Sequence, residues 1–265
     1  MKSKHCYISV SSSMTLNRPL YFIYKGTQFK FCPSEDKKYS DSLICRMGEL
    51  NHPEVYRKVC ELFASISYAH KVKAHVGGGI TNEVAMDIPL SEFKGGAYER
   101  RSVAITESYE TFYSLALVRN DHQSNLVRLY RKARLADDAY FSSLFYWHAL
   151  VYPYKKEQKA VKFINDNLGK VREDDVKRLT DEALFLKSGK VLDVGEYIRK
   201  GLRHSIAHIK RENEDYSDLN LDDYDEIRHI NTARSILEEL VRIRAEKDFG
   251  LEVGNDLNIF SPFDP

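Results

Sequence analysis

The chain changes the period of its hydrophobic pattern close to residue 105, and this change limits the folds that it can adopt. Before that point, aromatic and β-branched residues form short runs such as Leu20–Tyr24 and Gln28–Phe31, which are typical of strands. After it, apolar residues recur at three- and four-residue steps, as they do on one face of a helix. The sequence therefore predicts an α+β fold, in which a β-rich N-terminal part is followed by an all-α helical bundle.

We expect a β-rich domain over residues 1–104, a helical bundle over residues 105–250 and an irregular tail over residues 251–265. One helix interrupts the strands, since apolar residues recur at helical intervals over Pro53–Ala69. The tail combines two prolines with Asn and Asp, which favour irregular structure. The helices of the bundle are expected over residues 106–133, 137–151, 155–168, 174–187, 196–212 and 225–248.

The charge balance and the apolar runs argue against two classes of protein, a nucleic-acid binder that is basic overall and a protein that spans a membrane. Charged residues make up 30% of the chain, but the formal net charge is only +1, so any surface that binds nucleic acid must be local. No apolar run approaches the roughly 18 to 20 residues that span a membrane, and the first residues lack the apolar core of a signal peptide. We therefore expect a cytoplasmic protein that does not enter a membrane.

All four cysteines lie in the first 60 residues, and none forms a Cys-x-x-Cys pair. In a reducing cytosol we expect free thiols that pack as small hydrophobic residues. The alternative is a metal site assembled in three dimensions, although the sequence predicts neither a bound metal nor a cofactor. The cysteines are Cys6, Cys32, Cys45 and Cys60, and the alternative metal site would draw on Cys6, His5, His52 or His75.

The segment with the most chemical content is Arg203-His204-Ser205-Ile206-Ala207-His208, within the helix expected over residues 196–212. Because a helix turns about 100° per residue, Arg203, His204 and His208 lie within an arc of about 140°. Apolar residues gather on the opposite side, so one face can enter a core while the other presents cations and imidazoles. This arrangement suits the cleavage of a phosphodiester. The alternative is an ordinary amphipathic helix whose polar side chains are solvated.

These residues resemble the signature of the HEPN superfamily (higher eukaryotes and prokaryotes nucleotide-binding), in which an arginine and a polar residue are followed after a short gap by a histidine. The resemblance covers roughly residues 105–250. It implies an all-α bundle and a metal-independent endoribonuclease that works as a homodimer, in stress response or phage defence. The alternatives are a non-catalytic HEPN-like module that dimerises or binds a nucleotide as an accessory or regulatory protein, and an antitoxin.

The expected catalytic residues are Arg203, His208 and His204. Histidine can exchange a proton near neutral pH because its ordinary pKa is about 6.5, and the guanidinium of arginine matches phosphate oxygens. We therefore expect His208 to transfer the proton, Arg203 to hold the phosphate and His204 to orient the group. In a site shared across a dimer axis, each helix supplies one arginine and one histidine. Cleavage then leaves a 2′,3′-cyclic phosphate, and chelators do not stop it.

Two groups of basic residues are candidates for binding RNA through its phosphates. Lys200 and Arg211 share the face of the motif, and Arg128, Arg131 and Lys132 form a basic stretch that continues to Arg134. The alternative for the second group is a solvated helix surface. Acidic residues crowd residues 212–226, where we expect a solvated connection, with restraint of the nuclease or binding of a regulatory protein partner as the alternatives.

Overall fold

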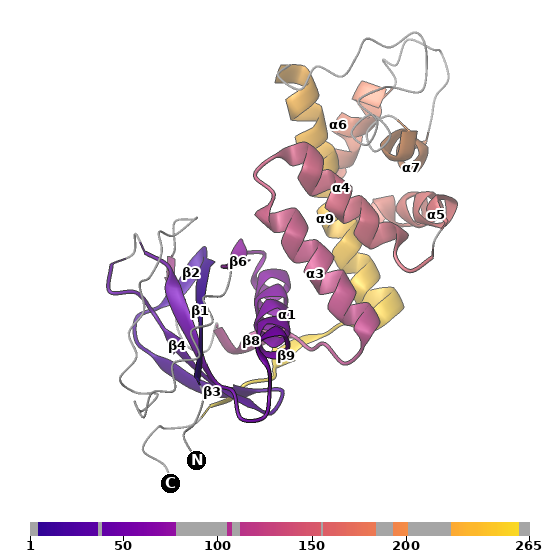
Figure 1. The fold of residues 1–265 in the computed structure, drawn as a ribbon. Coiled ribbons are helices and arrows are strands. Elements are labelled where there is room, and N and C mark those ends of the chain that lie inside the picture. Colours follow the sequence, from indigo (N-terminus) through magenta and orange to yellow (C-terminus); the bar gives the residue numbers. More distant parts are fainter. Residues whose placement is uncertain are drawn as a thin grey trace. The chain divides into compact units, whose positions relative to one another are not determined.

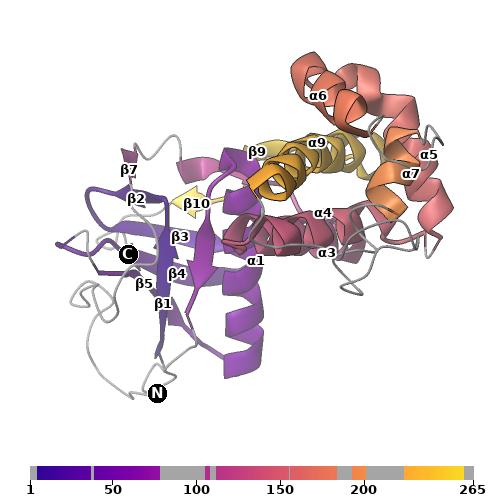
Figure 2. The same ribbon diagram turned by 90° about the horizontal axis from the view of Figure 1, so that it is seen from above.

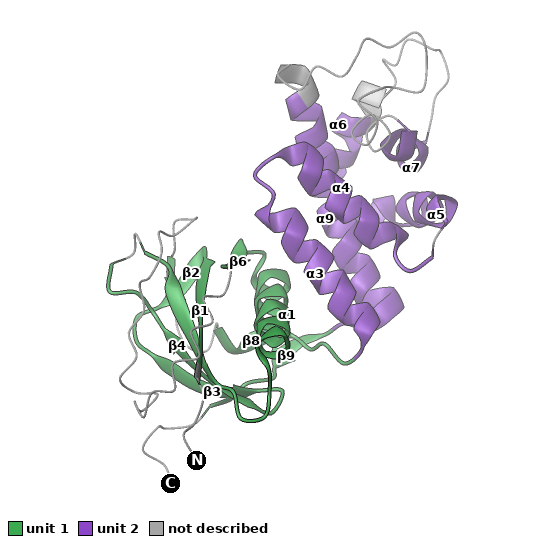
Figure 3. Cartoon of the chain, in the orientation of Figure 1, with its two compact units in different colours: residues 1–119, 252–265 green, residues 120–251 purple. Residues whose placement is uncertain are grey.

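The chain folds into two compact units, one rich in strands and one helical (Figure 3). The computed structural model describes residues 5–36, 39–77, 105–107, 112–154, 156–183, 193–200 and 224–259. The first unit comprises residues 1–119 together with 252–265, and the second comprises residues 120–251. The α+β class, with strands first and helices after them, is therefore confirmed. The boundary between the units falls after residue 119, whereas the change of period in the sequence lies near residue 105.

The first unit is built around a six-stranded sheet (Figure 1), in which the strands follow the order β10-β3-β4-β5-β1-β6. Strands β3 (Leu20–Tyr24) and β4 (Thr27–Cys32) form the hairpin that the sequence predicts. Lys25 and Gly26 make its turn with φ angles of 46° and 73°, a region that glycine enters at no steric cost. The other strands of this sheet are β1 (His5–Ser12), β5 (Asp41–Arg46), β6 (Ala74–Val76) and β10 (Asn258–Ile259).

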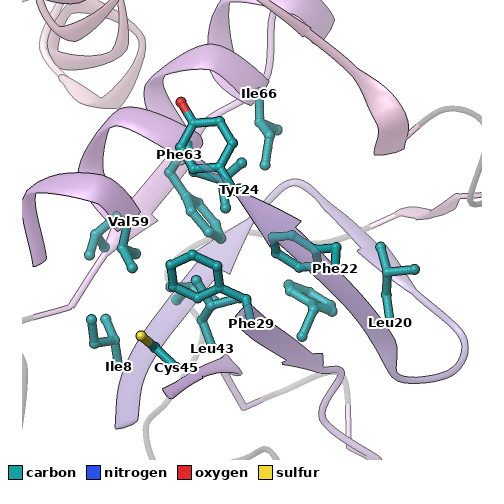
Figure 4. Close-up of a cluster of buried hydrophobic side chains, with 14 of the residues drawn as sticks. Ile8, Leu20, Phe22, Tyr24, Phe29, Leu43, Cys45, Val59, Phe63 and Ile66 are labelled. Carbon is teal, nitrogen blue, oxygen red and sulfur yellow. The ribbon is translucent and has the colours of Figure 1, made fainter. Parts of the chain in front are cut away.

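Helix α1 (His52–His70) packs against one face of this sheet, and the core of the unit lies between them (Figure 4). The helix begins at a capping box, in which the Asn51 side chain accepts the N–H of Glu54 at 3.0 Å and the Glu54 carboxylate accepts the N–H of Asn51 at 2.8 Å. This helix confirms the prediction over Pro53–Ala69. The buried side chains include Ile8, Leu20, Phe22, Phe29, Leu43, Val59, Phe63 and Ile66, each of which contributes about 1.5–3 kcal/mol to folding by leaving water.

The cysteines are free, as expected, and three of them are buried. Cys6 and Cys45 lie opposite each other on β1 and β5. Burial raises the pKa of Cys6 to about 11 and, with Cys6 as a lesser cause, the pKa of Cys45 to about 12. Burial also raises the pKa of Cys32 to about 11. These three thiols are therefore protonated at neutral pH and pack as small hydrophobic side chains.

The expected helix from residue 106 is wrong over its first part. Ile105–Glu107 forms strand β7, which pairs in parallel with β2 (Met14–Leu16), and Ser114–Ala116 forms strand β8. Phe112 and Tyr113 are helical, as expected. Helix α3 begins at Asp121, where Asn120 accepts the N–H of Gln123 at 2.9 Å and so caps it. The apolar residues from 112 to 118 belong to the first unit, where Phe112 and Leu115 are part of its core.

The tail, predicted to be irregular, contributes two strands. Val253–Asn255 forms β9, antiparallel to β8, and Asn258–Ile259 forms β10, antiparallel to β3. Both prolines of the tail come after residue 260. The backbone N–H groups of residues 253–259 can therefore donate hydrogen bonds to neighbouring strands. Their partner strands, β3 and β8, lie far away in the sequence, so no local pattern predicts these two strands.

The second unit is a bundle in which α4 and α9 pack against each other and against α3 (Figure 2). Helix α5 contacts α4 and α7, and α6 contacts α7 and α9. Trp147, the single tryptophan of the chain, is buried on α4, as its place in an aromatic-rich helix predicts. The helices are α3 (Asp121–Leu135), α4 (Ala139–Val151), α5 (Glu157–Asn167), α6 (Glu173–Ala183), α7 (Val194–Tyr197) and α9 (Tyr224–Phe249).

The longest of these helices, α9, buries a stripe at three- and four-residue steps, which includes Ile230, Ala233, Leu237, Leu240 and Val241. It ends at Gly250, whose φ of 59° is the left-handed conformation that terminates helices. Among the helices of the described ranges, none combines the length and the apolar character that crossing a bilayer requires.

Candidate functional site

The motif residues Arg203, His204, His208 and Arg211 lie outside the described residues, as does the acidic segment from 212 to 223. The structure does describe the chain that leads into the motif. Helix α7 is followed by residues 198–200 in π-helical conformation, and these are the last described residues before Arg203. Residues 193–200 are therefore called the lead-in to the motif.

Several contacts fix the lead-in within the helical unit. The Asp193 side chain caps α7 by accepting the N–H of Glu196 at 2.7 Å. The N–H of Gly195 donates to the Asn165 side chain of α5 at 2.9 Å. On the other side, the Tyr197 hydroxyl is hydrogen-bonded to the His229 ring of α9, and the two rings meet edge to face. The chain that leads to the motif is thus held by contacts with α5 and α9.

Charges on the lead-in are paired with one another. Arg199 donates from Nε and Nη2 to the two carboxylate oxygens of Glu196, at 2.8 and 2.7 Å, and its Nη1 lies 3.6 Å from Glu157 of α5. The hydrogen bonds from Arg199 lower the pKa of Glu196. Lys200, a predicted RNA contact, lies with its Nζ 3.6 Å from the same carboxylate. Glu196 therefore offsets part of the positive charge just before the motif.

The predicted basic stretch on α3 does not form one solvated stripe. Lys132 is exposed, Arg128 is half-buried and Arg131 is buried, with 6% of its surface accessible. Arg134 donates from Nη1 to both carboxylate oxygens of Glu238, at 3.2 and 3.1 Å, and so links α3 to α9. Of these four residues, only Lys132 is exposed.

A hollow of about 360 Å³ opens between α6 and α9. Three arginines line it, Arg172 and Arg178 from the α6 side and Arg228 from α9, and all three are exposed. One acidic residue, Asp175, also lines it but is buried. Among the lining residues that the structure describes, the formal charge is therefore positive by two, although the net charge of the whole chain is only +1.

The carboxylate in this hollow is already engaged. Asp175 accepts a hydrogen bond from the Ser235 hydroxyl at 2.9 Å, and Arg172 Nε lies 3.9 Å from the same oxygen. Arg178 has no hydrogen bond or ion pair with any residue in the described ranges. The hollow thus presents the exposed Arg178 to solvent, while its acidic residue is bonded to its own neighbours.

Two features of this region could not be found by searching for a compact motif, because their residues come from segments more than thirty positions apart. These features are the arginine-lined hollow and the Tyr197–His229 contact. A weaker signal was present, since Arg228, Asn231, Thr232 and Ser235 recur at helical spacing in the last helix and so predict one polar stripe. That stripe forms one wall of the hollow.

The comparisons with known proteins concern this same unit. A family model described as methylamine utilization protein MauJ matches residues 126–246, which is less than half of the chain. No curated protein and no solved structure matches the chain. The match begins in α3 and ends in α9, so it includes the hollow, the lead-in helix and the motif residues. The C-terminal region is therefore similar to MauJ, and the resemblance to HEPN proteins stays a prediction.

Proposed function

We propose that the protein is a metal-independent endoribonuclease of the HEPN type, with a site shared between two copies of the chain. The observation that carries the proposal is the order of residues in Arg203-His204-Ser205-Ile206-Ala207-His208, directly after a lead-in held between α5 and α9. Arg199, the other arginine with a histidine five positions later, is bound by Glu196. Arg203 is the better candidate for a phosphate contact.

In this mechanism His208 removes the proton of the ribose 2′-hydroxyl, and the oxygen attacks the neighbouring phosphorus while the bond to the 5′-oxygen breaks. The proton then passes from the resulting His208 imidazolium to that leaving oxygen. Arg203 binds the non-bridging oxygens, on which negative charge accumulates. The products are a 2′,3′-cyclic phosphate and a 5′-hydroxyl, and no step requires a metal ion.

The test compares the wild type with Arg203→Ala and His208→Ala on mixed tRNA and mRNA in the presence of EDTA. Each substitution is expected to reduce cleavage at least about 100-fold, because each removes a group that acts in the transition state. His122→Ala is the matched control, since His122 is a histidine of the same unit that is exposed and bonded to Tyr152. Its activity should equal that of the wild type.

A mixed dimer tests whether the site is shared. When the Arg203→Ala and His208→Ala chains are produced together, a dimer of one copy of each retains one intact pair, and about a quarter of the wild-type activity should return. Absence of cleavage by a folded, dimeric wild type, or cleavage that survives both substitutions, would contradict the proposal. In the first of these cases a non-catalytic binding module becomes the better interpretation.

A further inference from the structure

The hollow between α6 and α9 has the features of an anion-binding site. Its lining includes the exposed Arg172, Arg178 and Arg228, and the half-buried Asn231, whose amide donates to the carbonyl of Ile227 at 2.8 Å. A guanidinium presents a rigid fork of donors that matches two oxygens of one phosphate, and it remains charged at every physiological pH. Three such groups around one hollow favour a ligand with several anionic oxygens.

The size of the hollow limits that ligand. A volume of about 360 Å³ lies at the lower end of the range for small-molecule sites, roughly 300–1,000 Å³. One phosphate with an attached sugar or base fits such a space, whereas a folded partner does not. Ile227, with 38% of its surface exposed, lines the same hollow and offers an apolar surface beside the arginines.

The hollow is also close in the fold to the lead-in of the motif. Helix α6, which forms one wall, packs against α7 as well as against α9. Helix α9, which forms the other wall, is hydrogen-bonded to Tyr197 through His229, the neighbour of Arg228 in the sequence. The hollow therefore lies in the same unit as the lead-in and next to the elements that hold it.

We propose that this hollow binds a phosphate group of the RNA strand, as a subsite that holds the strand and does not take part in bond cleavage. The choice of RNA as the source of the phosphate rests on the proposed function. The chemistry of the site itself rests on the arginines. Asp175 supports the subsite by holding Ser235 and attracting Arg172, while Arg178 and Arg228 supply the contacts to the phosphate.

The experiment measures binding of a fluorescently labelled single-stranded RNA of about 12 nucleotides to the full-length His208→Ala protein, in which no substrate is consumed. Arg178→Ala and Arg228→Ala are each expected to weaken binding about five- to tenfold and to reduce the dependence of log Kd on log salt by about 0.7. Arg178→Lys should fall between Arg178→Ala and the parent, because it keeps the charge and loses the fork.

Lys177→Ala is the matched control, since Lys177 is an exposed cation next to Arg178 on α6 that does not line the hollow. It should change the affinity less than about twofold, because an exposed charge away from the ligand is screened by salt. Equal losses for Lys177→Ala and Arg178→Ala would mean that only general charge matters and would overturn the subsite. Unchanged affinity in both arginine variants would overturn it as well.

Competition with AMP and with inorganic phosphate distinguishes the two sources of the ligand. We expect each to displace the RNA only at concentrations far above the Kd of the RNA. If AMP binds more tightly than the RNA, and Arg178→Ala removes that binding, the hollow is a mononucleotide site and the RNA subsite is wrong. The binding result does not depend on catalysis. A wild type that fails to cleave RNA while Arg178→Ala still weakens binding would remove the proposed function and leave the subsite in place.

Discussion

Arg244 of α9 is fully buried, which is rare for a charged side chain. Its guanidinium lies 4.2 Å from the centre of the Tyr154 ring and 5.8 and 5.5 Å from the rings of Phe163 and Phe249. Asp248, one turn further along, lies 3.5 Å from Nε. Burial lowers the pKa of Arg244, and Tyr154 and Asp248 act in the opposite direction. Cation–π contacts and one ion pair thus replace most of the water around this charge.

Replacing this side chain should destabilise the helical unit. We expect Arg244→Ala to lower the free energy of unfolding by about 3 kcal/mol, because it leaves a cavity among the aromatic rings and removes the partner of Asp248. Arg244→Met, which fills the space without a charge, should recover part of this loss. The fluorescence of Trp147 during urea unfolding measures the effect, since the single tryptophan is buried in this unit.

Lys247→Ala is the control for this measurement, because Lys247 is an exposed cation on the last turn of the same helix. Its effect should stay within about 0.5 kcal/mol. Equal effects of Lys247→Ala and Arg244→Ala would show that the buried guanidinium contributes nothing specific.

At the scale of elements, the sequence predicts a helix or strand correctly where residues close together in the chain determine it. The hairpin around Gly26, helix α1 behind Asn51 and helix α9 up to Gly250 all follow from spacing, caps and turn residues. Strand β8 was missed because Leu115 and Ala116 are equally compatible with a helix, and the tail that pairs with them lies more than a hundred positions away. Pairing between distant segments decides such short apolar runs.

The candidate site divides in the same way. The motif could be found because its arginine and histidines lie within six consecutive residues, whereas the arginines of the hollow come from α6, from the residue just before it and from α9. The basic stretch on α3 shows the opposite problem. Successive positions of a helix point in different directions, so Arg131 is buried, Lys132 is exposed and Arg134 binds Glu238. A run of like charges in a sequence does not establish a common surface.

The close approach of α7 to α5 gives a prediction about the lead-in. A Cβ on Gly195 would lie 2.7 Å from the carbonyl oxygen of Val161 and 3.0 Å from Asn165 Oδ1. Both atoms belong to α5, and the first is backbone, so the contact cannot be relieved by a side-chain rotation. We expect Gly195→Ala to displace α7, to destabilise the unit by about 1–3 kcal/mol and to increase hydrogen exchange over residues 193–200.

Gly169 provides the control for this substitution. A Cβ at that position would have no heavy atom within 4 Å, so Gly169→Ala should leave both the stability and the exchange over residues 193–200 close to those of the wild type. If the two variants behave alike, the seat of α7 on α5 does not depend on the absence of a side chain at Gly195.

At the scale of the whole molecule, the chain leaves the strand-rich unit after residue 119, forms the helical unit and returns at residue 252. The two crossing points lie side by side in the first unit. Leu117 donates its N–H to the carbonyl of Glu252 at 2.8 Å, and the side chains of Arg119 and Glu252 form an ion pair at 2.8 Å. The helical unit is therefore inserted into the first unit, which depends on both ends of the chain.

Deleting residues 252–265 tests this dependence. The deletion removes β9 from β8 and β10 from β3. The N–H of Leu117 then loses its acceptor, the carbonyl of Glu252, and the amides of residues 114–117 that face β9 should exchange with solvent faster by at least about tenfold. Leu257, a buried residue in the core of the first unit, is lost as well, and we expect the first unit to unfold at a lower urea concentration.

Hydrogen exchange followed by mass spectrometry, with and without urea, measures both effects for each peptide. Fluorescence of Trp147 monitors whether the helical unit is still folded. Unchanged exchange at residues 114–117 in the truncated protein would mean that the returning segment does not hold β8 in place.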